Sequence, residues 1–154
     1  MASSLSLSRG WLESMAIRIL LVDDHPIVRQ GLKTLLAGHP GWEVIGEASD
    51  GMEAVDKADS LQPDVMVLDV TMPRMNGLEA CRLIRRKAPG MEILFVTQHD
   101  SPQMMREALE AGARGYVVKS NAARDLLEAV EAVSQHRVFT ALNRRDPVTH
   151  AQRI

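Results

Sequence analysis

The chain has 154 residues, a length that suits one domain with a hydrophobic core. Apolar residues make up 45% of it and charged residues 25%, as in an ordinary globular protein. The net charge of −2 argues against a protein that holds nucleic acid mainly through its own charge. The single cysteine, Cys81, excludes an internal disulfide, and we expect it to be a small buried hydrophobe.

Residues 1–16 are rich in serine and lack the apolar block of a signal peptide. A second methionine, Met15, stands almost directly before the first predicted strand. We therefore expect residues 1–16 to form a loosely ordered N-terminal extension. Because no apolar stretch is long enough to cross a membrane, we expect a cytoplasmic protein without membrane contact.

Strand and helix signals alternate from Ile17 onward. Short apolar runs predict strands, and apolar residues at helical spacing between proline, glycine and capping residues predict helices. The predicted strands are Ile17–Val22, Trp42–Ala48, Val65–Leu68, Glu92–Val96 and Gly115–Val118. The predicted helices run from about Pro26 to Leu36, Gly51 to Leu61, Gly77 to Lys87, Pro102 to Glu110 and Ala122 to Gln135. Asn76 is the predicted N-cap of the third helix.

Five strand–helix units in succession predict an α/β fold, a five-stranded parallel sheet with helices on both faces. Right-handed crossovers leave few topologies, and we expect the doubly wound, flavodoxin-like order 2-1-3-4-5. This domain covers residues 17–137. Residues 138–154 show little periodicity and are expected to be a linker or tail.

Acidic residues follow two of the predicted strands. Asp23 and Asp24 come directly after the first strand, and Asp69 follows the third. If these strands are neighbours, three carboxylates meet at one edge of the sheet and repel each other unless a cation lies between them. Such oxygen ligands suit Mg²⁺, which can hold a phosphoryl group beside a carboxylate nucleophile. The pattern predicts an aspartyl-phosphate site, in which His25 is interpreted as a helix-start residue without a chemical role.

Five strings of residues, each at a predicted strand end or in an adjoining loop, resemble the receiver domain of two-component response regulators. The resemblance covers about residues 17–137 and implies a CheY-like fold. One string alone is weak evidence, but the five in this order are specific. They are Leu21-Val22-Asp23-Asp24-His25-Pro26, Asp69-Val70-Thr71-Met72-Pro73-Arg74-Met75-Asn76-Gly77, Thr97, Gly112-Ala113-Arg114-Gly115-Tyr116 and Lys119.

The resemblance implies that Asp69 is the phosphoacceptor. It also implies that Mg²⁺ is held by the carboxylates of Asp23, Asp24 and Asp69 and by the backbone carbonyl of Thr71. Lys119 would pair with Asp69 at rest and with a phosphoryl oxygen after phosphorylation.

The resemblance further implies that Thr97 and Tyr116 form a switch pair. The Thr97 hydroxyl would move to the phosphoryl group, and Tyr116 would turn into the space it leaves. The positions of Thr71, Gln98 and His99 are those that tune phosphoryl lifetime in this family. Because the family usually has a small side chain where Gln98 stands, we expect an unusual lifetime.

Residues 24–32, and Lys119-Ser120 followed by Arg124-Asp125-Leu126-Leu127, resemble regulators of the NarL/FixJ type, which usually carry a LuxR-type DNA-binding output domain. Too few residues follow Arg137 to build such a domain here. We therefore expect a sensor histidine kinase as partner, homodimerisation on phosphorylation, and DNA contact only through an output domain outside this chain. Transcription regulation is the favoured role, and the protein is not expected to be an enzyme beyond its own phosphorylation and dephosphorylation.

Three alternatives remain. A stand-alone receiver relay would have the same site without an output domain. A haloacid-dehalogenase-type phosphatase also uses an aspartyl phosphate and Mg²⁺, but it wants a second aspartate where this chain has Thr71. A flavin- or nucleotide-binding module would need a glycine- and hydroxyl-rich loop after the first strand, where Asp23 and Asp24 would repel a phosphate.

Overall fold

The structure, a computed structural model, describes residues 16–141, so the predictions for residues 1–15 and 142–154 lie outside the described residues. The strands are β1 (Ile17–Val22), β2 (Trp42–Ala48), β3 (Val65–Leu68), β4 (Glu92–Thr97), β5 (Gly115–Val118) and β6 (Phe139–Ala141). The helices are α2 (Pro26–Ala37), α3 (Gly51–Leu61), α4 (Gly77–Lys87), α5 (Pro102–Glu110) and α6 (Ala122–Ser134), with a 3₁₀ turn, η1 (Lys119–Asn121).

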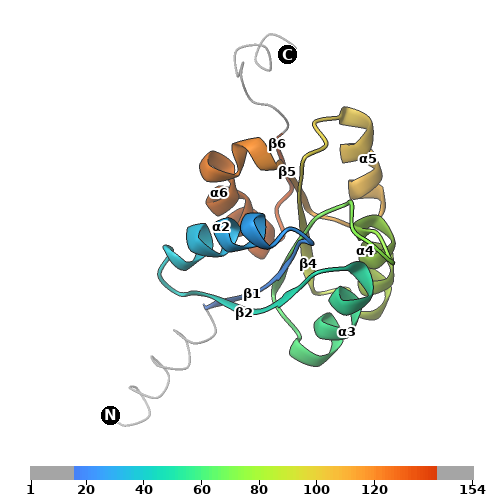
Figure 1. Cartoon of the computed structure of the whole chain (residues 1–154), viewed down its shortest axis with the longest axis horizontal. Helices are drawn as coiled ribbons and strands as arrows, with labels where there is room; N and C mark the ends of the chain where they lie inside the picture. The colour runs from blue at the N-terminus through green and yellow to red at the C-terminus, as the bar shows by residue number, and fades with distance from the viewer. Residues whose placement is uncertain (1–15, 142–154) are drawn as a thin grey trace.

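All six strands form one parallel sheet in the order β2-β1-β3-β4-β5-β6. Helices α2 and α6 cover one face of the sheet, and α3, α4 and α5 cover the other (Figure 1). The predicted α/β fold and the order 2-1-3-4-5 are confirmed. In the part of the chain that the structure describes, no helix is long and apolar enough to cross a bilayer.

The sixth strand was not predicted. Residues 138–154 were expected to be linker or tail, but β6 pairs with β5 from Gly115 to Val117, so this expectation is wrong for Phe139–Ala141. Three residues are too few to show a period. Tertiary contacts place these three residues in the sheet. The chain reverses at His136, whose φ is 62°, and Phe139 packs against the apolar layer under α2 and α6.

The two faces of the sheet carry separate apolar layers. Along β1, Ile19 and Leu21 point toward α2 and α6, whereas Leu20 and Val22 point toward α3 and α4. All four residues of β3 are buried, as expected for a central strand covered on both faces. Cys81 belongs to the layer under α3, α4 and α5, and burial raises the pKa of its thiol to about 12, in keeping with an unreactive core residue.

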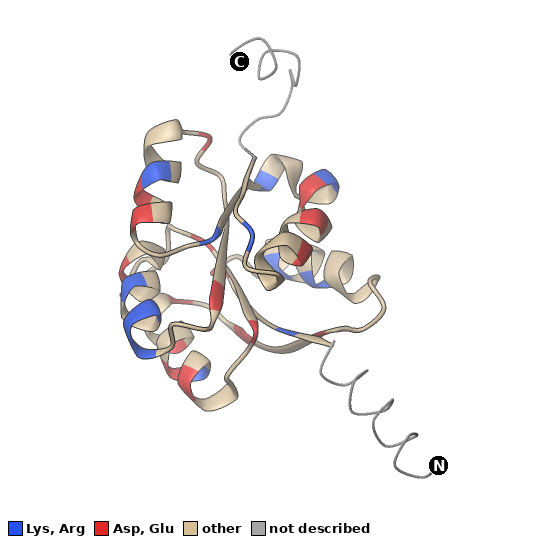
Figure 2. Ribbon diagram, turned by 180° about the vertical axis from the view of Figure 1, so that it is seen from behind, with Lys and Arg blue, Asp and Glu red and all other residues tan. Residues whose placement is uncertain are grey.

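Side-chain caps fix where three of the helices begin. Asp50, Asn76 and Ser101 each accept a hydrogen bond from the backbone N–H three residues ahead, at the starts of α3, α4 and α5. Asn76 and Glu79 form a reciprocal capping box, which confirms Asn76 as the predicted N-cap. Positive charges in the last turn of α4 complement its dipole, and charges of both signs are spread over the two helix layers (Figure 2).

A buried acid at the start of β4 ties several elements together. The Glu92 side chain is 2% exposed and contacts Arg85, Arg114 and His136, with its carboxylate oxygens 3.1, 3.2 and 2.5 Å from their nitrogens. Burial alone would raise the pKa of Glu92, but the bonds from His136 and Arg114 and the charge of Arg85 lower it below its ordinary value. The carboxylate is therefore charged, and it links α4 to the residue before β5 and to the turn after α6.

Replacing Glu92 by Gln is expected to lower the free energy of unfolding by about 2 kcal/mol at pH 7, because it removes the charge that pairs with Arg85, Arg114 and His136. The loss is no larger because Arg114 and His136 reach solvent, which weakens their ion pairs. A depressed carboxylate pKa contributes stability above its unfolded value, and that stability is lost as the pH falls through the folded value. The difference between wild type and Glu92→Gln in urea unfolding should thus shrink below about pH 4. Glu43→Gln, an exposed strand position, is the control, and an equal effect there would contradict the prediction.

Candidate functional site

The acidic residues predicted from the sequence meet at one edge of the sheet. β1 and β3 are paired neighbours, so Asp23 and Asp24 at the end of β1 lie beside Asp69 at the end of β3. One carboxylate oxygen from each of the three and a ring nitrogen of His25 all lie within 4.8 Å of one another. Asp23 and Asp69 are 1% and 3% exposed, whereas Asp24 is only partly buried. The cluster is therefore open on the side of Asp24.

Lys119 reaches this cluster from the end of β5. Its Nζ lies 2.8 Å from Oδ2 of Asp69 and 2.9 Å from Oδ2 of Asp23. Burial alone would lower the pKa of Lys119, but its contacts with the carboxylates of Asp69 and Asp23 outweigh burial and raise that pKa above its ordinary value. The ammonium group is thus charged and offsets part of the negative charge of the cluster.

His25 is a member of the cluster that the sequence interpretation left without a role. Its Nδ1 lies 3.1 Å from Oδ1 of Asp23 and 3.0 Å from Oδ1 of Asp24, while its side chain is 60% exposed. Its backbone N–H donates to Oδ1 of Asp23 at 2.8 Å. The only sequence signal for these contacts is its position directly after the two aspartates.

Two carboxylate oxygens of the cluster are buried without a hydrogen bond from the described residues, Oδ2 of Asp23 and Oδ1 of Asp24. Lys119 and His25 approach them only as ion pairs. A buried carboxylate oxygen without a well-aligned hydrogen bond is costly, and a cation that prefers oxygen ligands would satisfy both. The donor set therefore fits a hard divalent cation, and the structure has an acidic pocket of the predicted composition.

Asp69 has a partner on each of its two carboxylate oxygens. Its Oδ1 accepts the Val70 N–H at 2.7 Å, and its Oδ2 accepts from Lys119. Its own N–H donates to the Val22 carbonyl at 3.1 Å, which continues the pairing of β3 with β1. The loop after Asp69 is closed by a backbone hydrogen bond, in which the Gly77 N–H donates to the Val70 carbonyl at 2.7 Å. This geometry directs the Asp69 side chain toward Lys119.

The predicted switch residues lie on the next two strands. Thr97 ends β4 and Tyr116 lies within β5, and both are fully buried. The Tyr116 hydroxyl donates to the His99 carbonyl at 2.5 Å, and burial raises the pKa of that phenol. The Thr97 hydroxyl accepts from the His99 N–H at a long 3.5 Å. His99 therefore contacts both switch residues through its backbone.

The side chain of His99 also reaches the loop that follows Asp69. Its Nε2 lies 2.9 Å from the Thr71 hydroxyl, so the loop after β4 is bonded to the loop after β3. Gln98, the third residue of the predicted lifetime set, is exposed. The structure thus brings together Thr71 and His99, which stand 28 residues apart, and the sequence did not predict this contact.

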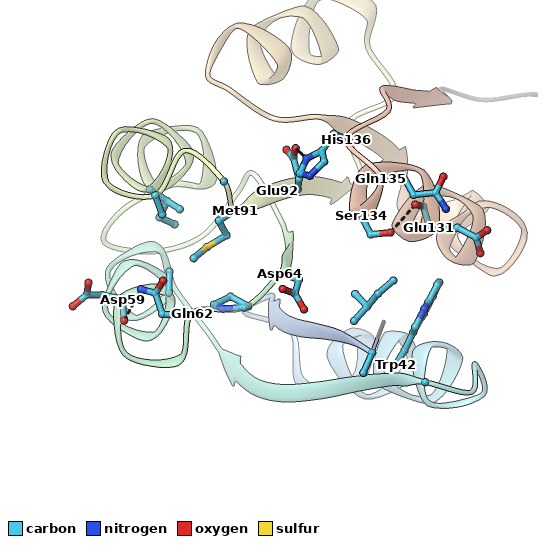
Figure 3. Close-up of a pocket in the computed structure, with 18 of the residues that line it drawn as sticks. Trp42, Asp59, Gln62, Asp64, Met91, Glu92, Glu131, Ser134, Gln135 and His136 are labelled. Carbon is cyan, nitrogen blue, oxygen red and sulfur yellow. Dashed lines mark hydrogen bonds and ion pairs between the residues drawn. The ribbon is translucent and has the colours of Figure 1, made fainter. Parts of the chain in front are cut away.

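A second pocket of about 1050 Å³ lies at the opposite edge of the sheet (Figure 3). Its lining includes Ile17, Trp42 and Glu92, the first residues of β1, β2 and β4. Its most deeply buried acid, Glu92, is already ion-paired with Arg85, Arg114 and His136. The pocket is therefore not a second acidic cluster, and the edge that carries Asp69 is the candidate functional site.

Comparison with known proteins supports this choice. The family model described as "Response regulator receiver domain" matches residues 19–131. The chain is 38% identical over 119 residues to the transcriptional regulatory protein DegU of Brevibacillus brevis, covering 77% of this chain and 50% of DegU. It is 41% identical over 121 residues to the DNA-binding transcriptional activator DevR/DosR of Mycobacterium tuberculosis, covering 79% of this chain and 56% of that protein.

Among solved structures, the fold resembles a two-component response regulator of the LuxR family from Aurantimonas sp. SI85-9A1. The TM-score is 0.81 at 37% identity, over 90% of this chain and 99% of that chain. The chain spans about half the length of the curated relatives it matches.

Proposed function

This chain belongs to the family of response regulator receiver domains, and from that membership we propose that it accepts a phosphoryl group on Asp69 and changes conformation in response. One observation carries the proposal: Asp69 is buried in an acidic pocket, and its Oδ2 is bonded to Lys119. A carboxylate at the end of a buried strand can attack phosphorus in line. Asp69 would form a new O–P bond while the phosphoryl group's bond to its donor breaks and the donor keeps the electron pair.

We propose Mg²⁺ as the cation of this pocket, with Asp23, Asp24 and Asp69 as carboxylate ligands and the backbone carbonyl of Thr71 as a further ligand. The unbonded oxygens of Asp23 and Asp24 support this assignment. When bound, Mg²⁺ would offset charge on the transferring phosphoryl group. Lys119 would leave Asp69 and bind a phosphoryl oxygen, since its raised pKa keeps it charged.

The conformational response is proposed to run through Thr97 and Tyr116. The Thr97 hydroxyl makes only a long contact to the His99 N–H, so it can turn to a phosphoryl oxygen with little loss. The Tyr116 hydroxyl is bonded to the His99 carbonyl. A shift of the loop that holds His99 would therefore change both contacts and reshape the surface formed by α5 and β5.

We propose a sensor histidine kinase as the donor, homodimerisation on phosphorylation, and control of transcription through a DNA-binding output domain. The printed names of the relatives, transcriptional regulatory protein and DNA-binding transcriptional activator, support this role. A stand-alone relay is the alternative, and it would use the same pocket. The cytoplasmic location expected from the sequence stays a prediction.

We propose no turnover of a separate substrate. A phosphatase of the haloacid-dehalogenase type needs an acid two residues after the nucleophile, and that position is Thr71, whose hydroxyl contacts His99. Incubation with p-nitrophenyl phosphate and Mg²⁺ should therefore release no nitrophenol above background.

The function is tested by intact-protein mass spectrometry after incubation with acetyl phosphate. We expect one phosphoryl group per chain in the presence of Mg²⁺, and none when EDTA removes the metal. Gain of a phosphoryl group that does not depend on Mg²⁺ would contradict the proposed metal site, and no gain at all would contradict phosphoacceptor function.

The contact between Thr71 and His99 predicts an effect on phosphoryl lifetime. Loss of a hydrogen bond worth about 1 kcal/mol corresponds to roughly a fivefold change in rate. His99→Ala is expected to shorten the lifetime by about that factor, because the bonded pair ties the loop after β4 to the loop that follows Asp69 and limits their movement. The phosphoryl lifetime is measured as the decay of the phosphorylated mass after removal of acetyl phosphate, in His99→Ala and in Gln98→Ala. Unchanged decay in both variants would rule out a lifetime role for this loop.

A further inference from the structure

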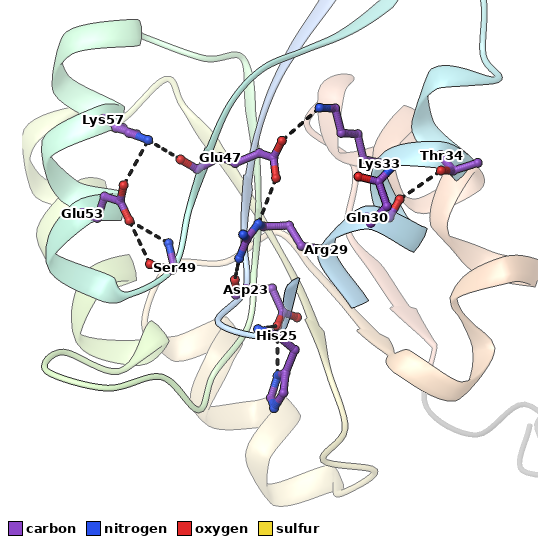
Figure 4. A network of polar contacts seen from close by, with 10 residues as sticks. All are labelled: Asp23, His25, Arg29, Gln30, Lys33, Thr34, Glu47, Ser49, Glu53 and Lys57. Carbon is purple, nitrogen blue, oxygen red and sulfur yellow. Dashed lines mark hydrogen bonds and ion pairs between the residues drawn. The ribbon is translucent and has the colours of Figure 1, made fainter. Parts of the chain in front are cut away.

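The turn that carries Asp23 and Asp24 is held by one residue of α2 (Figure 4). The Asp23 N–H donates to the Ala48 carbonyl of β2 at 3.1 Å, which fixes the turn where it leaves β1. On the other side, Nη1 of Arg29 donates to the Asp23 carbonyl at 2.5 Å. The Arg29 N–H donates to the His25 carbonyl at 2.9 Å. The bond from the Arg29 N–H is the first backbone hydrogen bond of α2, which any residue other than proline at position 29 would make, so the contact that depends on arginine is the one from Nη1 to the Asp23 carbonyl.

The Arg29 guanidinium is itself held in place by Glu47 on β2. Its Nε donates to Oε1 of Glu47 at 2.9 Å, and Nζ of Lys33, one turn further along α2, donates to Oε2 at 3.0 Å. The bond from Lys33 lowers the pKa of Glu47 against the effect of burial, and Arg29 lowers it further, so this carboxylate is charged. The Arg29 side chain is 20% exposed. A planar guanidinium can bond Glu47 and the Asp23 carbonyl together, which a lysine ammonium on its flexible stem does less well.

We propose that Arg29, oriented by Glu47, is a positioning residue that holds the Asp23–Asp24 turn in the geometry that binds the divalent cation. The inference rests on the proposed function, because it assumes that the acidic pocket binds Mg²⁺. Asp23, Asp24 and Asp69 repel one another before the metal arrives, and this repulsion favours movement of the Asp23–Asp24 turn away from Asp69. A turn that is already held in place loses less freedom when the cation binds.

A positioning role for Arg29 and a simple effect of its charge predict different Mg²⁺ affinities for the variants. Arg29 is positive, so its charge alone disfavours a nearby cation. If charge were its whole effect, Arg29→Gln would bind Mg²⁺ more tightly and Arg29→Lys would bind it as the wild type does. If Arg29 positions the turn, both variants bind Mg²⁺ more weakly, since lysine keeps the charge and loses the fork of donors.

The test is titration of the full chain with Mg²⁺ alone by isothermal titration calorimetry. Arg29→Lys is expected to raise the Mg²⁺ dissociation constant about tenfold, the usual cost of losing a group that orients a metal ligand. Lys33→Gln is the matched control on the same face of α2, because Lys33 bonds Glu47 but does not touch the turn. It is expected to bind Mg²⁺ within about twofold of the wild type.

A second measurement separates positioning from general loss of structure. The rate of phosphorylation by acetyl phosphate is followed as Mg²⁺ is raised, with urea unfolding in EDTA beside it. Arg29→Lys should reach the wild-type rate at saturating Mg²⁺ and need about tenfold more metal to do so. If Arg29→Lys does not fold, Glu47→Gln replaces it, because it leaves Arg29 in place and removes the charge that orients it.

The outcomes separate the inference from the function it rests on. Wild-type protein that binds no Mg²⁺ contradicts the proposed function, and this is evident before any variant is compared. Wild-type protein that binds Mg²⁺, with an unchanged dissociation constant in Arg29→Lys, overturns the positioning role. An equal loss of affinity in Lys33→Gln also overturns it, because the effect would then belong to the whole charge network.

Discussion

Asp69→Asn is expected to take up no detectable phosphoryl group from acetyl phosphate under conditions in which the wild type takes up one. An amide is a poor nucleophile, and removing a nucleophile typically costs more than about a thousandfold in rate. Among the described residues, neither neighbouring carboxylate takes the position of Asp69, because Asp23 accepts the His25 N–H and is ion-paired with Lys119, and Asp24 lies at the open side.

The fold should survive this substitution, since asparagine keeps the size of the side chain and Lys119 still contacts Asp23. Urea unfolding and far-ultraviolet circular dichroism measure that directly. Asp59→Asn, an exposed carboxylate on α3, is the control and should be phosphorylated as the wild type is. Normal phosphorylation of a folded Asp69→Asn protein would show that another residue is the acceptor.

Gly77→Ala is expected to disrupt the fold and the candidate site together. A Cβ atom on Gly77 would lie 2.0 Å from the carbonyl oxygen of Asp69, 2.9 Å from its carbonyl carbon and 3.0 Å from the ring of Phe95. Two of these atoms belong to the main chain of Asp69, so a rotamer change cannot relieve the overlap. Either α4 or the end of β3 must move, and forced overlap of this kind costs about 3 kcal/mol or more.

Urea unfolding should therefore show a loss of about 3 kcal/mol in Gly77→Ala, and the folded fraction should be phosphorylated more slowly because Asp69 is displaced. Gly31→Ala is the matched control. It lies in α2, where an added Cβ meets nothing within 4 Å, and it should gain about 0.5–1 kcal/mol because alanine favours a helix. Wild-type stability in Gly77→Ala would mean that α4 does not pack as closely on Asp69 as the structure has it.

The acidic pocket could be predicted from the sequence because it depends on topology alone. Apolar runs that end in Asp23 and Asp69 mark two strands, and parallel strands that are neighbours bring their carboxyl ends together. Thr97 and Lys119 follow from the same rule applied to β4 and β5. No knowledge of side-chain packing was needed to place these residues at one edge.

Other contacts could not be predicted because they depend on which polar side chains meet after packing. Arg29 and Glu47 stand 18 residues apart, and Thr71 and His99 stand 28 apart, and neither pair leaves a periodic signal. The ion pairs of Glu92 and the pairing of β6 likewise appear only when α6 is folded back on the sheet. A charged residue in such a contact has the same sequence signature as one that faces solvent.

The measurement that tests the central claim most directly is chemical trapping of the phosphorylated residue. Sodium borohydride reduces an aspartyl phosphate to homoserine, and peptide mass spectrometry then identifies the converted position. In wild-type protein treated with acetyl phosphate and Mg²⁺, we expect homoserine at position 69, with Asp23 and Asp24 unchanged. Homoserine at position 23 or 24, or no conversion in protein whose mass shows the added phosphoryl group, would contradict Asp69 as the phosphoacceptor.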